Sequence, residues 1–139
     1  MLTTNYRNHP QILDLFNREI YKGLLVAAES NSVPGRVGKT WDSFTSSRDI
    51  FEKSNVVGVR RLFISVDGIA RRESNSRSWC NEHQVFVART LLEELYAYRT
   101  EDGDRIGPKD VMIMSPYKNQ RKLVTALSRP KQVFIIMGK

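Results

Sequence analysis

Tyr6 and Arg7 are the first residues of the chain whose types and spacing could do chemistry. They lie shortly before Pro10, and a proline at the first position of a helix sacrifices no hydrogen bond, so we expect a helix to begin there. A tyrosine ring can stack on a base, and an arginine can donate two charge-assisted hydrogen bonds to a phosphate. The pair is a candidate nucleotide contact. The alternative is a tyrosine that packs on its own helix beside a solvated arginine.

A second stretch, residues 35–40, ends like a phosphate-binding P-loop, with Gly38, Lys39 and Thr40. The P-loop requires a glycine five positions before its second glycine, and Val33 occupies that position. A buried strand is not indicated before this stretch, nor an apolar-periodic helix after it. We therefore predict that residues 35–40 form a solvated loop.

Composition and charge limit the classes of protein to consider. The 139 residues are enough for one domain with its own core, and the net charge of +7 favours an anionic partner such as nucleic acid or a nucleotide. The single cysteine, Cys80, excludes an internal disulfide and a thiolate zinc cluster, and no metal site is predicted. Since no membrane-spanning run and no signal-peptide pattern occurs, we expect an intracellular protein, cytoplasmic or nuclear, without membrane contact.

Helices and apolar strands are predicted to alternate along the chain. Apolar periodicity predicts helices at residues 10–22, 81–98 and 117–127, and short apolar runs predict buried strands at 62–66, 111–114 and 133–137, with a turn at 100–107. Residues 28–60 are polar, and we expect a surface excursion that is partly mobile. This alternation predicts an α/β fold with a parallel sheet and flanking helices.

Four segments in this order carry a resemblance to a known family: residues 2–12, residues 78–81 with Gln84, residues 111–120, and residues 126–131 with the strand after them. Together they resemble the second, C-terminal RecA-like AAA domain of superfamily 1 helicases, in the nonsense-mediated-decay and senataxin-like branch. The first segment is similar to motif IV and the last to motif VI, while Gln84 stands where the family usually has Glu. The resemblance implies that residues 1–139 are a partial RecA-like domain of the P-loop NTPase superfamily.

The resemblance also implies half of an ATP site. In the family, motif IV supplies an aromatic ring that stacks on the adenine and an arginine that reaches the γ-phosphate, which correspond to Tyr6 and Arg7. Motif VI supplies an arginine finger that stabilises the transferring phosphoryl group, which corresponds to Arg129. Arg7 and Arg129 are thus candidate catalytic residues, and Tyr6 joins them as a candidate contact to ATP bound with Mg²⁺.

A nucleic-acid track is implied by the third segment. Ser115, Tyr117 and Lys118 lie where the family's second domain approaches the backbone of a single strand, of RNA or DNA. Lys118 could contact a phosphate. The alternative for Lys118 is a solvated lysine at the end of a helix.

Three departures from the family pattern restrict what the chain should do alone. The P-loop lysine and the acidic Mg²⁺-binding pair belong to a first RecA-like domain, an implied partner that would precede Met1. Motif V, Gln-Gly-x-Glu, is missing between Gln120 and Arg129, as though a segment near residues 122–125 were lost, and Pro130 restricts Arg129 to extended geometry. We therefore expect a fragment of an ATP-dependent helicase that does not hydrolyse ATP by itself. The alternatives are a non-catalytic nucleic-acid-binding or remnant module and an unrelated basic α/β domain.

Overall fold

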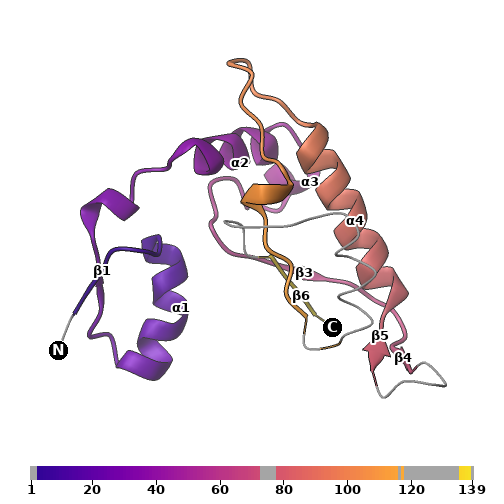
Figure 1. The fold of residues 1–139 in the computed structure, drawn as a ribbon, viewed down its shortest axis with the longest axis horizontal. Coiled ribbons are helices and arrows are strands. Elements are labelled where there is room, and N and C mark those ends of the chain that lie inside the picture. Colours follow the sequence, from indigo (N-terminus) through magenta and orange to yellow (C-terminus); the bar gives the residue numbers. More distant parts are fainter. Residues whose placement is uncertain (1–2, 73–77, 116, 118–134, 139) are drawn as a thin grey trace. The chain divides into compact units, whose positions relative to one another are not determined.

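The computed structural model describes residues 3–72, 78–115, 117 and 135–138. The chain divides into two compact units, Met1–Arg61 and Leu62–Lys139. Figure 1 shows the helices and strands of both units along the chain. Each unit is described by itself below.

The first unit opens with a strand–helix–strand crossover. β1 (Thr4–Asn5) and β2 (Val26–Ala27) pair in parallel, and α1 (Pro10–Tyr21) connects them (Figure 1). The helix begins at the predicted proline and ends where Lys22 and Gly23 adopt positive φ angles of 53° and 77°, the left-handed geometry that commonly stops a helix. Because the strands are parallel, the loop between β1 and α1 lies at their carboxyl edge.

The remainder of the first unit contains helices where the sequence predicted irregular structure. A short 3₁₀ helix, η1 (Glu29–Asn31), is followed by α2 (Arg36–Ser46) and α3 (Asp49–Lys53). The prediction of a solvated loop at residues 35–40 is wrong, because α2 begins at Arg36 and Thr40 is buried.

An aromatic cluster explains why this polar stretch forms helices. The ring centroid of Trp41 lies 6.0 Å from that of Phe44 and 6.3 Å from that of Phe51. The centroids of Phe44 and Phe51 are 5.9 Å apart, and Phe44 is fully buried. The indole N–H of Trp41 donates a hydrogen bond to the carbonyl oxygen of Val59 at 3.0 Å. Aromatic pairs of this kind contribute about 0.5–1.5 kcal/mol each beyond their burial. A few large side chains therefore organise a segment that is otherwise rich in Ser, Asn and Gly.

In its described residues, the second unit contains a parallel strand pair and a long helix. β3 (Leu62–Ser65) pairs in parallel with β6 (Ile135–Gly138), and α4 (Glu82–Ala97) is the long helix. Asn81 caps α4, since its side-chain oxygen accepts a hydrogen bond from the backbone N–H of Gln84 at 3.3 Å. The parallel pair and the capped helix confirm the predicted α/β character and the predicted start of α4.

Shorter elements complete this unit. β4 (Arg71–Arg72) and β5 (Trp79–Cys80) form an antiparallel pair just before α4, and η2 (Pro108–Asp110) follows the turn after it. The turn predicted at residues 100–107 is present, with Gly103 at a positive φ of 81°. Among the described residues of this unit, the buried apolar side chains are Val66, Val85, Leu91, Leu92, Leu95, Ile106 and Val111.

Two strand predictions differ from the structure. Residues 111–115 carry no strand assignment: Val111 is buried, whereas Met112 and Met114 are exposed. β3 is a strand as predicted, but its side chains alternate between half-buried and exposed, with Phe63 exposed. The prediction of burial on both faces is wrong because β3 covers apolar surface on one side only. The helix predicted at residues 117–127 lies outside the described residues except for Tyr117.

Candidate nucleotide site

The loop between β1 and α1 is shaped by the side chain at its start. The Oδ1 atom of Asn5 accepts hydrogen bonds from the backbone N–H groups of Arg7 at 2.9 Å and of Asn8 at 2.8 Å. An asparagine that bonds to the backbone two residues ahead forms a tight Asx turn. At the end of the loop, Nδ1 of His9 accepts a hydrogen bond from the backbone N–H of Gln11 at 3.2 Å and so caps α1. Both ends of the loop are thereby fixed.

Asn31 also stabilises the loop between β1 and α1. Its Nδ2 donates hydrogen bonds to the carbonyl oxygens of Asn5 at 2.9 Å and of Asn8 at 3.2 Å. These two carbonyls stand on either side of Tyr6 and Arg7, so a single side chain from η1 braces the backbone that carries both candidates. This role of Asn31 could not be predicted from the sequence, because an asparagine more than twenty residues away matches no short motif.

The Tyr6 and Arg7 side chains project from this braced backbone into solvent. Tyr6 is 76% exposed and Arg7 is also exposed. Neither side chain has a hydrogen bond or an ion pair with the part of the chain that the structure describes. The exposure of Tyr6 does not fit the alternative of a tyrosine packed on its own helix. Ligands of open α/β folds bind at the carboxyl edge of parallel strands, and a helix N-terminus favours phosphate. The loop has both properties.

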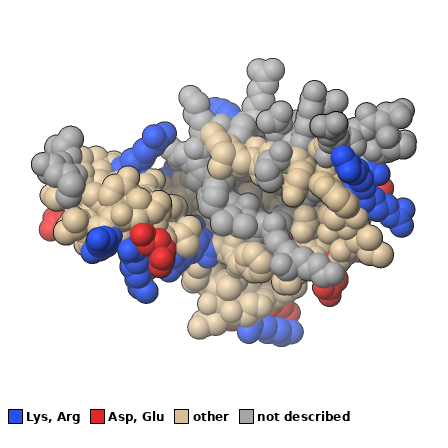
Figure 2. Space-filling model, turned by 90° about the horizontal axis from the view of Figure 1, so that it is seen from below, with Lys and Arg blue, Asp and Glu red and all other residues tan. Residues whose placement is uncertain are grey.

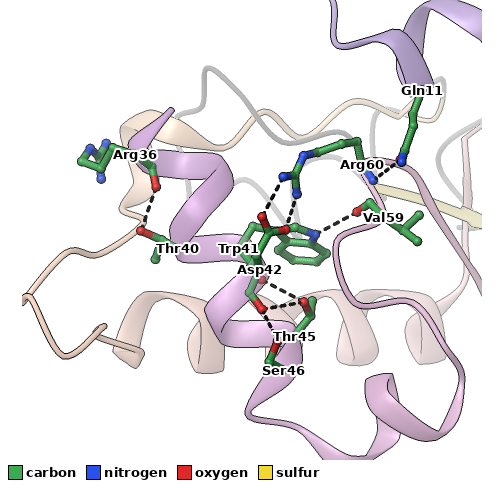
Figure 3. A network of polar contacts seen from close by, with 9 residues as sticks. All are labelled: Gln11, Arg36, Thr40, Trp41, Asp42, Thr45, Ser46, Val59 and Arg60. Carbon is green, nitrogen blue, oxygen red and sulfur yellow. Dashed lines mark hydrogen bonds and ion pairs between the residues drawn. The ribbon is translucent and has the colours of Figure 1, made fainter. Parts of the chain in front are cut away.

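Arg60 links α1 to α2 through contacts with Gln11 and Asp42 (Figure 3). The Arg60 guanidinium donates two hydrogen bonds to Asp42, of which the one from Nη2 to Oδ2 measures 2.7 Å, and the Arg60 side chain is only 14% exposed. The backbone N–H of Arg60 donates to Oε1 of Gln11 at 2.8 Å. The bond to Asp42 raises the pKa of Arg60 above its ordinary value. This bidentate pair was not singled out from the sequence, since its partners are far apart in the chain.

The environment of His9 favours its neutral imidazole. Its pKa is lowered, first by burial and second by the positive charge of Arg60, while Asp42 acts in the opposite direction. A neutral imidazole leaves one ring nitrogen free to accept a hydrogen bond, which the observed bond from Gln11 to Nδ1 requires. The cap of α1 is therefore sensitive to protonation.

The other predicted site residues belong to the second unit. The backbone N–H of Tyr117 donates to Oγ of Ser115 at 3.1 Å, and Tyr117 is exposed while Ser115 is half-buried. Lys118 and Arg129 lie outside the described residues. The structure thus brings Tyr6 together with Arg7, and Ser115 together with Tyr117.

The described residues hold neither a metal-ligating cluster nor a membrane-spanning helix. Residues 3–72, 78–115, 117 and 135–138 contain no group of three or more His, Cys, Asp or Glu side chains that could hold a metal ion. No helix in those ranges is long and apolar enough to cross a membrane.

The comparisons with known proteins agree on one family. The AAA domain family matches residues 1–133. "Putative helicase mov-10-B.2" of Danio rerio is 32% identical over 139 residues, which cover 99% of this chain and 13% of that protein. "Putative helicase MOV-10" of Gallus gallus is 31% identical over 121 residues, 86% of this chain and 12% of that protein. "3'-5' exoribonuclease HELZ2" of Mus musculus is 25% identical over 131 residues, 90% of this chain and 4% of that protein. The chain spans a small part of each relative's length.

Proposed function

Because the chain belongs to the AAA domain family and is a superfamily 1 helicase-like domain, we propose that it supplies the second-domain half of an ATP-dependent helicase acting on single-stranded nucleic acid. The observation that carries the proposal is the braced loop at the carboxyl edge of β1 and β2, with Tyr6 and Arg7 exposed upon it. A rigid backbone carrying a free ring and a free guanidinium suits a bound nucleotide, because little ordering is left to occur on binding.

Each candidate residue has a distinct role in this proposal. Tyr6 stacks on the adenine, and Arg7 contacts the γ-phosphate. Arg129 stabilises the charge that develops on the transferring phosphoryl group. Ser115, Tyr117 and Lys118 contact the backbone of the single strand in the second unit.

The rest of the catalytic apparatus belongs to a first RecA-like domain. We assign the P-loop lysine and the ligands of the ATP-bound Mg²⁺ to that domain, because positioning and charge stabilisation by such groups supply most of the catalysis of phosphoryl transfer. The chain is expected to act inside the cell, in the cytoplasm or the nucleus, where its nucleic-acid substrate occurs.

The test is ATP turnover by a fusion of this chain to a first RecA-like domain of a superfamily 1 helicase, with and without single-stranded RNA or DNA. We expect turnover that the single strand stimulates and that Arg129→Ala lowers by at least about a thousandfold, the usual contribution of an arginine finger. Arg89→Ala is the matched control, since Arg89 is an exposed arginine paired with Glu93 on α4. Strand binding with no turnover in the fusion, with or without a restored motif V, would favour the non-catalytic module instead.

A further inference from the structure

The β4–β5 pair carries an arginine and a tryptophan directly opposite each other. In its antiparallel register Arg72 faces Trp79, and Arg71 faces Cys80. Directly opposed residues of an antiparallel pair project from the same side of the ribbon, with Cβ atoms about 4.5–5.5 Å apart. Arg72 and Trp79 therefore share one face, and Arg71 lies on the other.

This face is open to solvent. Trp79 is 42% exposed, and both arginines are exposed. Within the described residues, neither Arg71 nor Arg72 has an ion pair. Ile69, just before β4, is exposed as well. A large indole that the fold leaves accessible beside exposed guanidinium groups indicates a surface that receives a ligand, because tryptophan is usually well buried.

The ribbon is firmly attached at its base. A Cβ atom on Gly68 would lie 2.6 Å from Oδ1 of Asn81 and 3.0 Å from Cβ of His83, so the chain entering β4 packs directly on the start of α4. Nδ1 of His83 is 3.0 Å from the carbonyl oxygen of Asp67 and makes a hydrogen bond with it. These contacts fix the stem of the ribbon to a rigid helix, which is the arrangement expected of a binding element rather than of a loose loop.

Positive charge alone does not distinguish the Arg72–Trp79 face from the rest of the surface. Figure 2 shows Lys and Arg side chains in several separate groups on the visible surface, without one continuous basic patch. The β4–β5 pair differs from a simple basic group because it combines a guanidinium with an accessible aromatic ring. That combination matches a single strand, whose phosphates attract arginine and whose unpaired bases stack on aromatic rings.

We propose that the β4–β5 pair is a contact for single-stranded nucleic acid, in which Trp79 stacks on a base and Arg72 binds the adjacent phosphate. The contact uses other residues than Ser115, Tyr117 and Lys118, and it rests on the proposed function only for the choice of ligand. Arg71 on the opposite face adds to the local positive potential. The contact requires no ATP, because it involves no residue of the nucleotide loop, the loop between β1 and α1 that carries Tyr6 and Arg7.

The test measures binding of the full chain to fluorescently labelled 15-nucleotide RNA and DNA strands over a range of salt concentrations, without ATP. Trp79→Ala should weaken binding on the order of tenfold, as expected for loss of one base–aromatic stack, and Trp79→Phe should restore most of it. Arg72→Gln should weaken binding and reduce the slope of log K against log salt by about 0.7, the value for one phosphate contact on a single strand. Arg89→Ala on α4 should leave both quantities unchanged. Circular dichroism of each variant establishes that it is folded.

Heparin, a polyanion without bases, distinguishes base stacking from simple attraction of charge. Heparin affinity should fall with Arg72→Gln but not with Trp79→Ala. Unchanged strand binding in folded Trp79→Ala and Arg72→Gln variants would overturn the proposal, as would equal losses for heparin and for the strands in Trp79→Ala. The two proposals can fail separately. If the fusion hydrolyses ATP but Trp79→Ala and Arg72→Gln bind strands normally, only the β4–β5 contact is refuted. If these variants lose strand binding but the fusion does not hydrolyse ATP, only the ATP-dependent activity is refuted.

Discussion

At the residue scale, the conformation of the loop between β1 and α1 is set by side chains that bond to its backbone, and not by Tyr6 and Arg7 themselves. Asn5, Asn31 and His9 make five hydrogen bonds to main-chain groups on or next to the loop. Such bonds offer the chain an alternative to helix and sheet pairing, which is why the turn is sharp enough to present two successive side chains to solvent.

Asn31→Ala should loosen the nucleotide loop. The substitution removes the donor shared by the Asn5 and Asn8 carbonyls. The Asn5 carbonyl keeps its hydrogen bond from the backbone N–H of Ala28 at 2.9 Å, so the penalty falls mainly on the Asn8 carbonyl, and we expect a loss of about 1–2 kcal/mol in the free energy of unfolding. Urea denaturation measures the loss. Ser32→Ala, at the exposed neighbouring position, should change the unfolding free energy by less than about 0.5 kcal/mol. Equal stability of the two variants would show that Asn31 does not brace the loop.

His9 should make stability depend on pH. Its pKa in the folded protein is below the ordinary value of about 6.5, so the unfolded chain binds a proton first as the pH falls. The contribution of neutral His9 is therefore complete above about pH 6.5 and is lost as the pH falls toward the lower folded-state pKa. Urea midpoints between pH 8 and pH 5 should decline less in His9→Asn, which keeps a capping side chain without a titratable ring. Parallel curves for wild type and variant would contradict this assignment.

At the element scale, the parts of the fold with a regular apolar pattern were predictable and the others were not. Apolar periodicity after Pro10 predicted α1, although its buried side chain is Leu13 while Leu15 is exposed, and Asn81 predicted the start of α4. α2 and α3 were missed because their stability comes from three aromatic rings that meet in space, not from a long apolar period. The strand predicted at residues 111–114 is absent from the structure. A short apolar run indicates burial better than it indicates pairing with a neighbouring strand.

Phe44→Ala tests whether the aromatic cluster organises α2 and α3. Phe44 is fully buried and contacts both other rings, so its truncation should reduce the free energy of unfolding by about 3–5 kcal/mol. Because α3 has only five residues, it cannot persist without this packing, and circular dichroism should show a loss of helix. Ile50→Ala is the control, since Ile50 is 70% exposed on the same short helix. A similar small effect for both variants would place the stabilising contacts elsewhere.

At the scale of the whole molecule, the proposed ATP contact draws on both compact units, because Arg129 belongs to Leu62–Lys139. The nucleotide loop lies in Met1–Arg61, whereas Ser115, Tyr117 and the β4–β5 pair lie in Leu62–Lys139. The sequence predicted Tyr6 and Arg7 as a pair because they are adjacent and precede a marked helix. It could not reveal Asn31, or the Arg60–Asp42 pair, because those contacts join residues that are distant in the chain. The other candidate residues came from the resemblance to the helicase family, whose motifs occur in a fixed order. They are Ser115, Tyr117, Lys118 and Arg129.

The measurement that tests the central claim most directly is the separation of KM for ATP from kcat in the fusion to a first RecA-like domain. Tyr6→Ala should raise KM with little change in kcat, because stacking on the adenine is equal in the ground state and the transition state. Arg7→Ala should lower kcat by at least about a thousandfold, because its contact strengthens as charge develops on the phosphoryl group. Arg18→Ala, an exposed arginine of α1 outside the loop, should affect neither constant. If Tyr6→Ala and Arg7→Ala both behaved like Arg18→Ala while the fusion hydrolysed ATP, the braced loop would not be the nucleotide site.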